Sequence, residues 1–430
     1  MKLAPLACLL VACGARVSAP RPFAHRLVVV SIDGLMPDAY LDPDAHGLKV
    51  PTLRALVAGG ASARVRGVMP TVTYPAHTTI VTGVPPRVHG IVSNEPLDPM
   101  FTNHDGWRWY AEDVAAPTIY GAVEAAGGRA ALVIWPVTVG ARASVVVPEY
   151  WRAGGPDDQK LLRALATPGV LDDTARATPD LWTHLTPPDI EDAAPFAIAR
   201  TVLATRAPDL LMVHAFGLDD AQHAHGPWSP EAKATIENAD RELGVLLAQL
   251  EHDPRWPETT FVVVSDHGFR AIDHELRLPA LFAAHDLNGA QVAVLSNGGT
   301  AFVYVLDPSK RDSIDAALAE LGDHVARRID HDQLVAMGGD PNASFALVAA
   351  PGNGFSLART GAPVTDLQAT RGTHGWPPDD PDMAASFIAF GPGVAHASLG
   401  TIDMLDLAPT FARWLGVALP SAQGKPLPIR

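Results

Sequence analysis

The sequence predicts an α/β fold with a mostly parallel sheet, helices on both faces of that sheet, and an inserted α+β segment. Three observations lead to this prediction. Short runs of β-branched and other apolar residues recur along the chain, helical patterns separate them, and one later stretch is patterned differently. Strands that alternate with helices form a parallel sheet that is covered on both faces.

The apolar runs have the length and composition of fully buried strands. The first covers residues 26–32, and four more are predicted over 130–135, 209–214, 260–265 and 386–390. In such sheets, function gathers at the carboxyl ends of the strands. The residues that directly follow these runs are therefore the first candidates for a functional site.

The helical patterns lie between these runs. They cover residues 51–57, 119–126, 193–205 and 229–250, and a final helix is predicted over 404–415. Helices placed between successive strands supply the crossover connections that a parallel sheet needs.

Residues 277–357 are predicted to form an insertion packed beside the active face. Within it we expect two strands and one helix, over 301–306, 344–350 and 313–325. A single catalytic α/β domain would then comprise residues 26–276 and 358–425.

Composition and net charge exclude several classes of protein. The chain has 430 residues, of which 47% are hydrophobic and 18% charged, which suits a large buried core and excludes the disordered and fibrous classes. The formal net charge of −15 argues against binding a nucleic-acid polymer, which needs basic surfaces. The acidity either serves solubility or includes carboxylates that bind metal, and net charge does not distinguish the two.

The N-terminus predicts export. Residues 1–19 combine Lys2, a short apolar run and small residues, which is typical of an export signal and too short to span a bilayer. The run also resembles a bacterial lipoprotein signal that ends before Cys13, with cleavage after Ala19 as the alternative. We expect a protein of the bacterial periplasm, either free or anchored to the membrane through a lipid on Cys13. Both cysteines, Cys8 and Cys13, lie in this segment, so the folded body contains no disulfide.

Three carboxylates follow predicted strands. Asp33 comes directly after the first strand, Asp266 and His267 come directly after the run over 260–265, and Asp219 follows the run that ends near His214. A lone aspartate at such a place is more often a helix cap or a turn residue. Three at one edge of a sheet, two of them with a histidine nearby, indicate a metal site instead.

Histidines complete the candidate metal site. Asp219 and His223 are four residues apart, so a helix would place both on one face. His374 lies in a glycine-rich loop and could also be an ordinary loop residue. Mixed aspartate and histidine ligands suit zinc, whereas Mg²⁺ prefers oxygen ligands, and manganese or iron could replace zinc.

A short helix carries the candidate nucleophile. Pro75 and Gly83 bracket this helix, so Thr73 lies at its N-terminus, where free N–H groups favour an anion. A threonine hydroxyl that contacts a metal can lose its proton and attack phosphorus. Thr73 could equally be a helix cap, and Thr71 is an alternative nucleophile.

Together these residues resemble the alkaline phosphatase superfamily, most closely its nucleotide pyrophosphatase/phosphodiesterase branch. Residues 70–83 are similar to the nucleophile motif of that branch, Pro-Thr-x-Thr-Phe/Tyr-Pro-x-His followed by Thr-Gly. The resemblance extends from about Arg26 to the C-terminus. It implies an alkaline phosphatase-like fold and two zinc ions per chain, with other divalent transition metals as substitutes.

The resemblance also assigns roles to residues. It implies one zinc held by Asp219, His223 and His374, and a second, facing Thr73, held by Asp33, Asp266 and His267. Asn94 would hydrogen-bond a phosphate oxygen, and Tyr74 would stack on a base or apolar leaving group. The implied activity is hydrolysis of a small phosphodiester or phosphoanhydride, of nucleotide or related type, through a phospho-threonine intermediate.

Several alternatives stay open. Ala76 and Gln222 depart from the residues usual in the branch, which affects the pocket rather than the ligands. The stretch after Trp135 lacks the Lys-x-Arg pair of threonine-type phosphate monoesterases, so a diester is preferred over a monoester. A sulfatase motif and preceding membrane helices for a phosphoethanolamine transferase are also missing from the sequence. A non-catalytic metal-binding protein is the alternative from another class.

Overall fold

The computed structural model describes residues 23–103, 106–152, 155–186 and 189–429. The predicted export signal over 1–19, including Cys13, lies outside these ranges. No helix within them is both long and apolar enough to cross a membrane.

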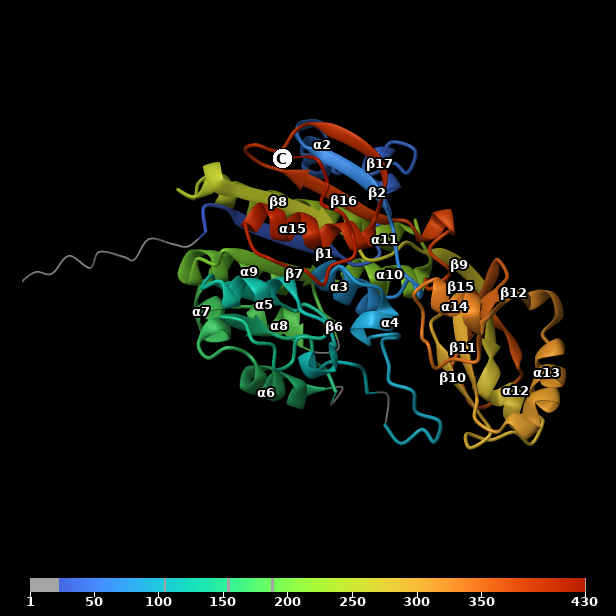
Figure 1. Cartoon of the computed structure of the whole chain (residues 1–430). Helices are drawn as coiled ribbons and strands as arrows, with labels where there is room; N and C mark the ends of the chain where they lie inside the picture. Colours follow the sequence, from blue (N-terminus) through green and yellow to red (C-terminus); the bar gives the residue numbers. More distant parts are fainter. Residues whose placement is uncertain (1–22, 104–105, 153–154, 187–188, 430) are drawn as a thin grey trace, which may run out of the picture.

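An eight-stranded sheet forms the centre of the molecule, with the strand order β17-β2-β16-β8-β1-β7-β3-β4 (Figure 1). Its strands are β1 (Arg26–Ile32), β2 (Ala61–Arg66), β3 (Ala130–Val133), β4 (Val145–Val147), β7 (Leu210–Ala215), β8 (Thr259–Val264), β16 (Ala385–Phe390) and β17 (Ala397–Asp403). Neighbouring strands are parallel except where β16 pairs antiparallel with β8 and β2. The mostly parallel α/β fold is therefore confirmed.

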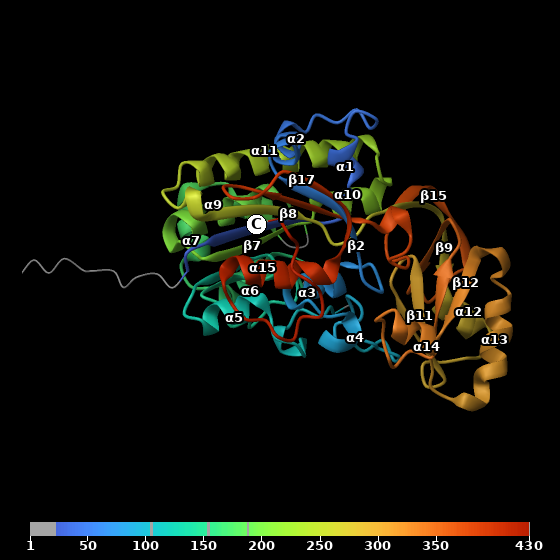
Figure 2. The ribbon, with the colours of Figure 1, turned by 45° about the horizontal axis from the view of Figure 1, so that its top comes forward.

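Helices cover both faces of this sheet, as predicted (Figure 2). Side chains alternate along β1: Val28 and Val30 belong to a core with α2 (Pro51–Gly59), α9 (Ala193–Arg206) and α11 (Pro230–Glu251). Leu27 and Val29 face the opposite core, with α5 (Ile119–Ala125) and α15 (Leu407–Leu415). This alternation explains why the strand is apolar at nearly every position.

Shorter helices complete this part of the chain. They are α1 (Asp38–Leu41), α3 (Thr73–Thr82), α4 (Pro86–His89), α6 (Pro156–Leu165), α7 (Val170–Ala177), α8 (Leu181–His184) and α10 (Gly217–His225). The helix predicted over 404–415 begins as a 3₁₀ turn over Met404–Asp406 and becomes α15.

The segment predicted as an insertion builds a sheet of its own, drawn in orange beside the main body in Figure 1. Its four antiparallel strands are β10 (Val292–Ser296), β11 (Thr300–Val305), β12 (Val325–Asp330) and β13 (Phe345–Ala349). Its helices are α12 (Leu278–Ala284), α13 (Arg311–Ala319) and α14 (His331–Ala336). The helix predicted over 313–325 ends six residues earlier, because a 3₁₀ turn at Gly322–His324 leads into β12.

A three-stranded sheet joins the insertion to the catalytic part. It contains β9 (Arg270–Arg277), β14 (Gly352–Ser356) and β15 (Val364–Thr373), in the order β14-β9-β15. Strands β9 and β15 were not predicted, because their charged and exposed side chains hide the strand pattern. They matter for function, since β9 follows His267 and β15 ends immediately before His374.

Candidate two-metal and nucleophile site

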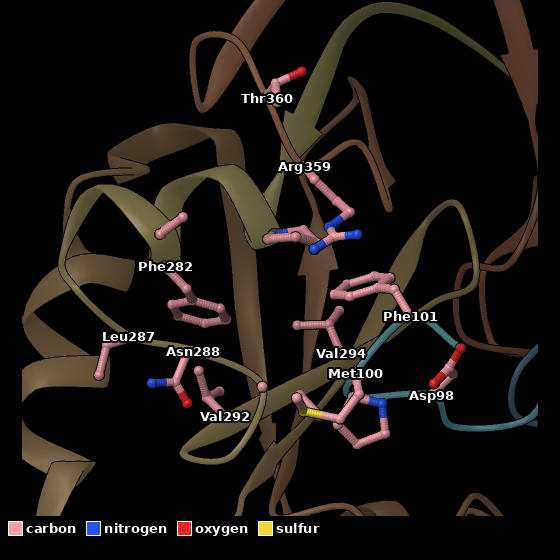
Figure 3. Close-up of a pocket in the computed structure, with 15 residues that line it drawn as sticks. Asp98, Met100, Phe101, Phe282, Leu287, Asn288, Val292, Val294, Arg359 and Thr360 are labelled. Atoms are coloured by element: carbon pink, nitrogen blue, oxygen red, sulfur yellow. The ribbon is translucent and has the colours of Figure 1, made fainter. Parts of the chain in front are cut away.

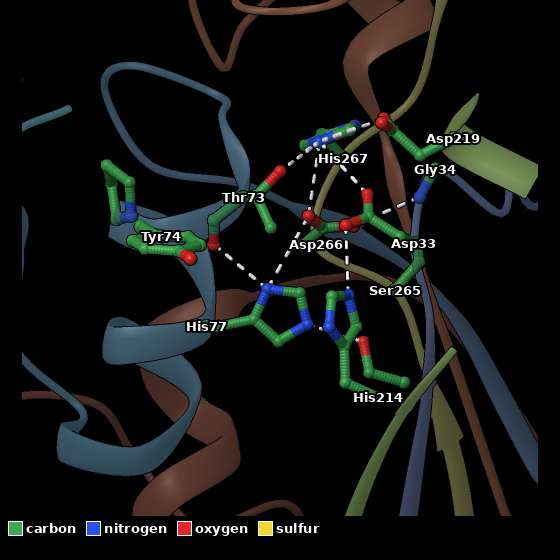
Figure 4. A network of polar contacts seen from close by, with 12 residues as sticks. Asp33, Gly34, Thr73, Tyr74, His77, His214, Asp219, Ser265, Asp266 and His267 are labelled. Carbon is green, nitrogen blue, oxygen red and sulfur yellow. Dashed lines mark hydrogen bonds and ion pairs between the residues drawn. The ribbon is translucent and has the colours of Figure 1, made fainter. Parts of the chain in front are cut away.

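The carboxylates predicted at the sheet edge lie together (Figure 4). Asp33 follows β1, Asp266 follows β8, and Asp219 lies in the first turn of α10, which follows β7. Because these three strands are adjacent and parallel, their carboxyl ends meet at one edge. These aspartates were selected from the sequence because they follow predicted strands, and they lie together in the structure for the same reason.

One group of possible ligands consists of Asp33, Asp266 and His267, all buried. The Nε2 atom of His267 lies 3.3 Å from Oδ1 of Asp33 and 3.1 Å from Oδ2 of Asp266. The backbone N–H of Gly34 donates to Oδ1 of Asp266 at 3.1 Å and fixes that carboxylate. This group matches one of the two predicted ligand sets.

A second group surrounds Asp219. Its Oδ1 atom lies 3.6 Å from Nε2 of His374 and 4.0 Å from Nε2 of His267, and its Oδ2 atom lies 3.4 Å from Nε2 of His223. Asp219, His267 and His374 each offer one ligand atom, and these three atoms lie within 4.8 Å of one another. We assign His223 to this group, because its Nδ1 atom donates to the Gly372 carbonyl at 2.9 Å and leaves Nε2 free to face Asp219.

Burial shifts the protonation of the carboxylates. Desolvation, followed by the charges of Asp266 and Asp219, raises the pKa of Asp33 well above its usual value. Desolvation and the charge of Asp266 likewise raise the pKa of Asp219 well above normal, and desolvation raises the pKa of Asp266. Three acids held this close favour a bound cation that would offset their mutual repulsion.

The candidate ligand histidines are neutral. Desolvation lowers the pKa of His267 and His374 well below the usual value, and it lowers the pKa of His223. The contacts of His267 with Asp33 and Asp266 are therefore not ion pairs of a charged imidazole. A neutral imidazole nitrogen beside a carboxylate is the donor set that zinc binds.

Unsatisfied polar atoms show that this donor set fits cations. Within the described ranges, three buried carboxylate oxygens of these residues have no hydrogen-bond partner: Oδ1 of Asp33, Oδ1 of Asp219 and Oδ2 of Asp266. Buried polar atoms almost always have a partner, so such a concentration needs an explanation. Divalent cations coordinated by this group would supply it.

The structure separates the two candidate nucleophiles. Thr71 is fully buried and its hydroxyl donates to the Trp376 carbonyl at 2.6 Å. The Oγ1 atom of Thr73 instead lies 3.4 Å from Nε2 of His267, and Thr73 begins α3 without capping it. His77, one turn later, donates through Nδ1 to the Thr73 carbonyl at 2.9 Å and holds this residue in place.

Asn94 and Tyr74 contact each other at the start of α3. The Oδ1 atom of Asn94 accepts a hydrogen bond from the backbone N–H of Tyr74 at 2.9 Å, which leaves the carboxamide N–H₂ group as a donor. The side chain of Tyr74 is completely buried and its hydroxyl donates to Oε1 of Glu149 at 2.9 Å. Tyr74 therefore lies behind the wall of the site, with its ring edge-on to Trp107 at 5.3 Å.

Two site residues escaped the sequence analysis. His214 lies on β7 with Nε2 at 3.0 Å from Oδ2 of Asp33 and Nδ1 at 3.1 Å from Oε2 of Glu149. Burial alone would lower the pKa of His214, but hydrogen bonds to Asp33 and Glu149 raise it well above normal. Glu149 follows β4, so the rule about strand ends would have found it if that three-residue strand had been recognised.

A cavity of about 190 Å³ opens beside Thr73. Its lining residues are Asp33, Thr73, Trp107, Glu149, Trp151, His214, Phe216, Asp219 and Asp220. A larger cavity of about 540 Å³ lies elsewhere, between residues 98–101 and the insertion (Figure 3). None of the predicted site residues lines the larger cavity, so the smaller one is the candidate substrate pocket.

Comparisons with known proteins identify relatives of this chain. An uncharacterized pyrophosphatase/phosphodiesterase of Schizosaccharomyces pombe is 28% identical over 261 residues, which are 57% of this chain and 45% of that protein. The human ectonucleotide pyrophosphatase/phosphodiesterase family member 5 is 25% identical over 268 residues, 59% of this chain and 47% of that protein. The chain thus spans about half the length of these curated relatives.

A solved structure extends the likeness to the whole fold. It is the murine ectonucleotide pyrophosphatase/phosphodiesterase 5, as an inactive threonine-to-alanine variant in complex with AMP. It superposes with a TM-score of 0.67 at 20% identity, over 93% of this chain and 97% of that one. The family profile for type I phosphodiesterase / nucleotide pyrophosphatase matches residues 27–377, and the chain belongs to this family.

Proposed function

We propose that the chain is an exported hydrolase that uses two metal ions and Thr73 to cleave a phosphodiester or phosphoanhydride bond. The observation that carries the proposal is the cluster of three aspartates and three histidines beside the Thr73 hydroxyl, in which three buried carboxylate oxygens are unsatisfied in the described part of the chain. Membership of the family supports the reaction class. The apolar segment after Lys2 supports export.

The proposed ligands divide into two sets. Asp33, Asp266 and His267 would hold one ion, and Asp219, His223 and His374 the other. Bound there, divalent cations such as zinc would favour loss of the Thr73 proton and neutralise charge on the reacting phosphate. Zinc follows from the mixed aspartate and histidine donors, and other divalent transition metals fit the same set.

The protein residues orient the reaction. Oγ1 of Thr73 forms a bond to phosphorus while the bond from phosphorus to the leaving oxygen breaks, and a water molecule then cleaves the phospho-threonine bond. The N–H₂ group of Asn94 would donate to a phosphate oxygen, because its Oδ1 atom already accepts a hydrogen bond from the backbone N–H of Tyr74. His77 holds the backbone of the nucleophile through the Thr73 carbonyl.

A diester suits the cavity better than a monoester. Among the described residues that line it, none is a lysine or arginine that could hold the additional charge of a monoester. The relative that was solved in complex with AMP supports a nucleotide-sized product for that protein. A phosphate monoesterase remains the alternative, and a metal-binding protein without turnover the weaker one.

The test compares two nitrophenyl substrates. We would measure kcat/KM of the zinc-loaded protein on nitrophenyl thymidine phosphate, a diester, and on nitrophenyl phosphate, a monoester. The diester should be preferred, and Thr73→Ala should abolish turnover of both while two metal ions stay bound. Thr71→Val is the matched control, because it removes a nearby hydroxyl that is already bonded to Trp376. Preference for the monoester would move the chain to the monoesterases, and full activity of Thr73→Ala would refute the nucleophile.

A further inference from the structure

A hairpin of the insertion reaches the loop that carries His374. Strands β10 and β11 pair antiparallel and are joined by the turn over residues 297–299. The backbone N–H of Gly299 donates to the His374 carbonyl at 2.7 Å, and the hydroxyl of Thr300 donates to the Gly375 carbonyl at 2.8 Å. The insertion is therefore hydrogen-bonded directly to a segment of the candidate metal site.

Glycines allow the close approach of these two segments. A Cβ atom added to Gly375 would overlap the Asn297 carbonyl oxygen, and one added to Gly298 would overlap the His374 carbonyl oxygen. Both glycines also have positive φ angles, +96° at Gly375 and +71° at Gly298, which glycine adopts without a steric cost. Backbone atoms thus hold the turn over 297–299 against the His374 loop, so its position does not depend on flexible side chains.

Asn297 extends this contact to the proposed phosphate donor. The residue is 4% exposed, and its Oδ1 atom accepts a hydrogen bond from the hydroxyl of Ser93 at 2.9 Å. Ser93 is also buried, and it directly precedes Asn94 in the chain. The hydrogen bond therefore links the turn that contacts His374 to the loop that carries Asn94, although the bonded residues are 204 positions apart.

The loop around Asn94 has no regular secondary structure to hold it. Among the described residues, no helix or strand lies between the end of α4 at His89 and the 3₁₀ turn at Ala111–Asp113. The Asn94 carbonyl accepts from the backbone N–H of Arg108 at 2.8 Å, and its Oδ1 atom accepts from the backbone N–H of Tyr74. The place of the Asn94 carboxamide consequently depends on a few single contacts, and the Ser93 contact is next to it.

The carboxamide of Asn297 is costly as a purely structural group. Its Nδ2 atom is buried and, in the part of the chain that the structure describes, has no hydrogen-bond partner. A buried donor without a partner loses its hydration, and an apolar side chain at this place would avoid that loss. What the carboxamide does supply is the acceptor for Ser93. This combination indicates a role through Ser93 rather than in the stability of the hairpin.

We propose that Asn297 is a positioning residue of the phosphate site. Its bond to Ser93 holds Asn94 in the place where the N–H₂ group meets a phosphate oxygen beside Thr73. The turn over 297–299 ties this donor to the loop of the proposed metal ligand His374. The inference rests on the proposed function, because it assigns a further residue to the same site. The insertion then supplies part of the geometry that binds phosphate.

A mutant cycle with Asn94 separates positioning from structural support. Asn297→Ala and Ser93→Ala remove the two ends of the same bond, and Asn94→Ala removes the donor itself. On nitrophenyl thymidine phosphate, each of the first two variants should lower kcat/KM about 5–20-fold, less than the roughly 100–1,000-fold loss that follows removal of an oxyanion donor. In the Asn94→Ala background, neither should lower kcat/KM further, because the group that they position is gone.

Ser296→Ala is the matched control. Ser296 lies in the same hairpin, and its hydroxyl donates to the Phe355 carbonyl at 2.9 Å, so its loss weakens the hairpin and should leave kcat/KM unchanged. Equal losses in Asn297→Ala and Ser296→Ala would overturn the inference. So would unchanged kcat/KM in Asn297→Ala and Ser93→Ala, or losses that persist in full in the Asn94→Ala background. The two variants alter different elements, so a folding defect in one leaves the other to decide.

Phosphate binding distinguishes failure of this inference from failure of the proposed function. The Kd of inorganic phosphate for the zinc-loaded protein is measured by titration calorimetry and needs no turnover. Asn297→Ala and Ser93→Ala should each raise this Kd about 5–20-fold, but not in the Asn94→Ala background. That pattern in a protein that hydrolyses no diester would refute the phosphodiesterase and support the inference. Hydrolysis that depends on Thr73, with unchanged kcat/KM and Kd in both variants, would refute the inference and support the proposed function.

Discussion

The buried chain of contacts from Asp33 through His214 to Glu149 predicts strong energetic coupling in the metal-free protein. His214 and Glu149 are each 1% exposed, and both ring nitrogens of His214 face carboxylate oxygens at 3.0 and 3.1 Å. His214→Phe keeps a ring beside Phe216 but leaves two buried acids without their partner. Breaking a buried pair in this way costs about 3–5 kcal/mol of unfolding free energy.

The double variant gives the magnitude of the coupling. Glu149→Gln keeps an acceptor for the Tyr74 hydroxyl but removes the charge that faces His214, at a cost of about 1–3 kcal/mol. In the His214→Phe background, Glu149→Gln breaks no contact with His214. It also removes one of the two buried acids that His214→Phe left without a partner. The double variant should therefore be less destabilised than the sum of the single variants, by about 1–3 kcal/mol.

Urea unfolding followed by circular dichroism, in the presence of a chelator, measures this coupling. The matched control pairs His214→Phe with Asp312→Asn, an exposed and distant change, and should be additive. Additivity of His214→Phe and Glu149→Gln within about 0.5 kcal/mol would refute the reasoning. The pKa of His214 is raised in the folded state, so its stabilising charge is present below the unfolded pKa of about 6.5 and is lost as pH rises through the folded pKa. The coupling should accordingly weaken at alkaline pH.

Four further outcomes are expected. Gly34→Ala should destabilise by about 2 kcal/mol and weaken zinc binding in a competition titration, because φ is +67° and a Cβ atom would lie 2.8 Å from Nε2 of Gln222. Burial lowers the pKa of His89 to about 3, so the folded state loses stability as pH falls below the unfolded value of about 6.5. Between pH 7 and 5, the His89→Gln variant should lose about 2 kcal/mol less unfolding free energy than the wild type. Chelation of the zinc-loaded protein should lower Tm, because bound metal adds about 4 kcal/mol to the free energy of unfolding when free metal is a thousandfold above Kd. In a bacterial host, Cys13→Ser should move the protein from the membrane to the soluble fraction, and Cys8→Ser should not.

The fold followed from local patterns because its central strands are buried on both faces. All five predicted strands of the main sheet occur within a few residues of their expected places, as β1, β3, β7, β8 and β16. The missed strands lack this signal for physical reasons. Strand β2 alternates apolar residues with Arg64 and Arg66, β4 has only three residues, and β17 lies at the sheet edge with exposed side chains.

The candidate ligands were predictable for a related reason. Asp33, Asp219 and Asp266 each follow a strand that could be recognised, and adjacent parallel strands bring their ends together. The choice between Thr71 and Thr73 depended instead on a contact across the chain, the hydrogen bond from Thr71 to the carbonyl of Trp376. No pattern within residues 70–83 contains that information. Metal binding by these residues stays a prediction until it is measured.

The aromatic lining of the candidate substrate pocket was the least predictable part, because its residues have no common local pattern. Trp107 lies in a loop, Trp151 follows an unrecognised strand, and Phe216 follows a recognised one. Each is an ordinary apolar residue by itself, and only the folded chain places their rings within 6 Å of a neighbour. Glu149 carried the same signal as Asp33 and Asp219, as an acid after a strand, but that strand was not recognised. The candidate metal ligands of this fold are therefore encoded at strand ends, whereas the lining of the candidate pocket depends on side chains that only tertiary packing brings together.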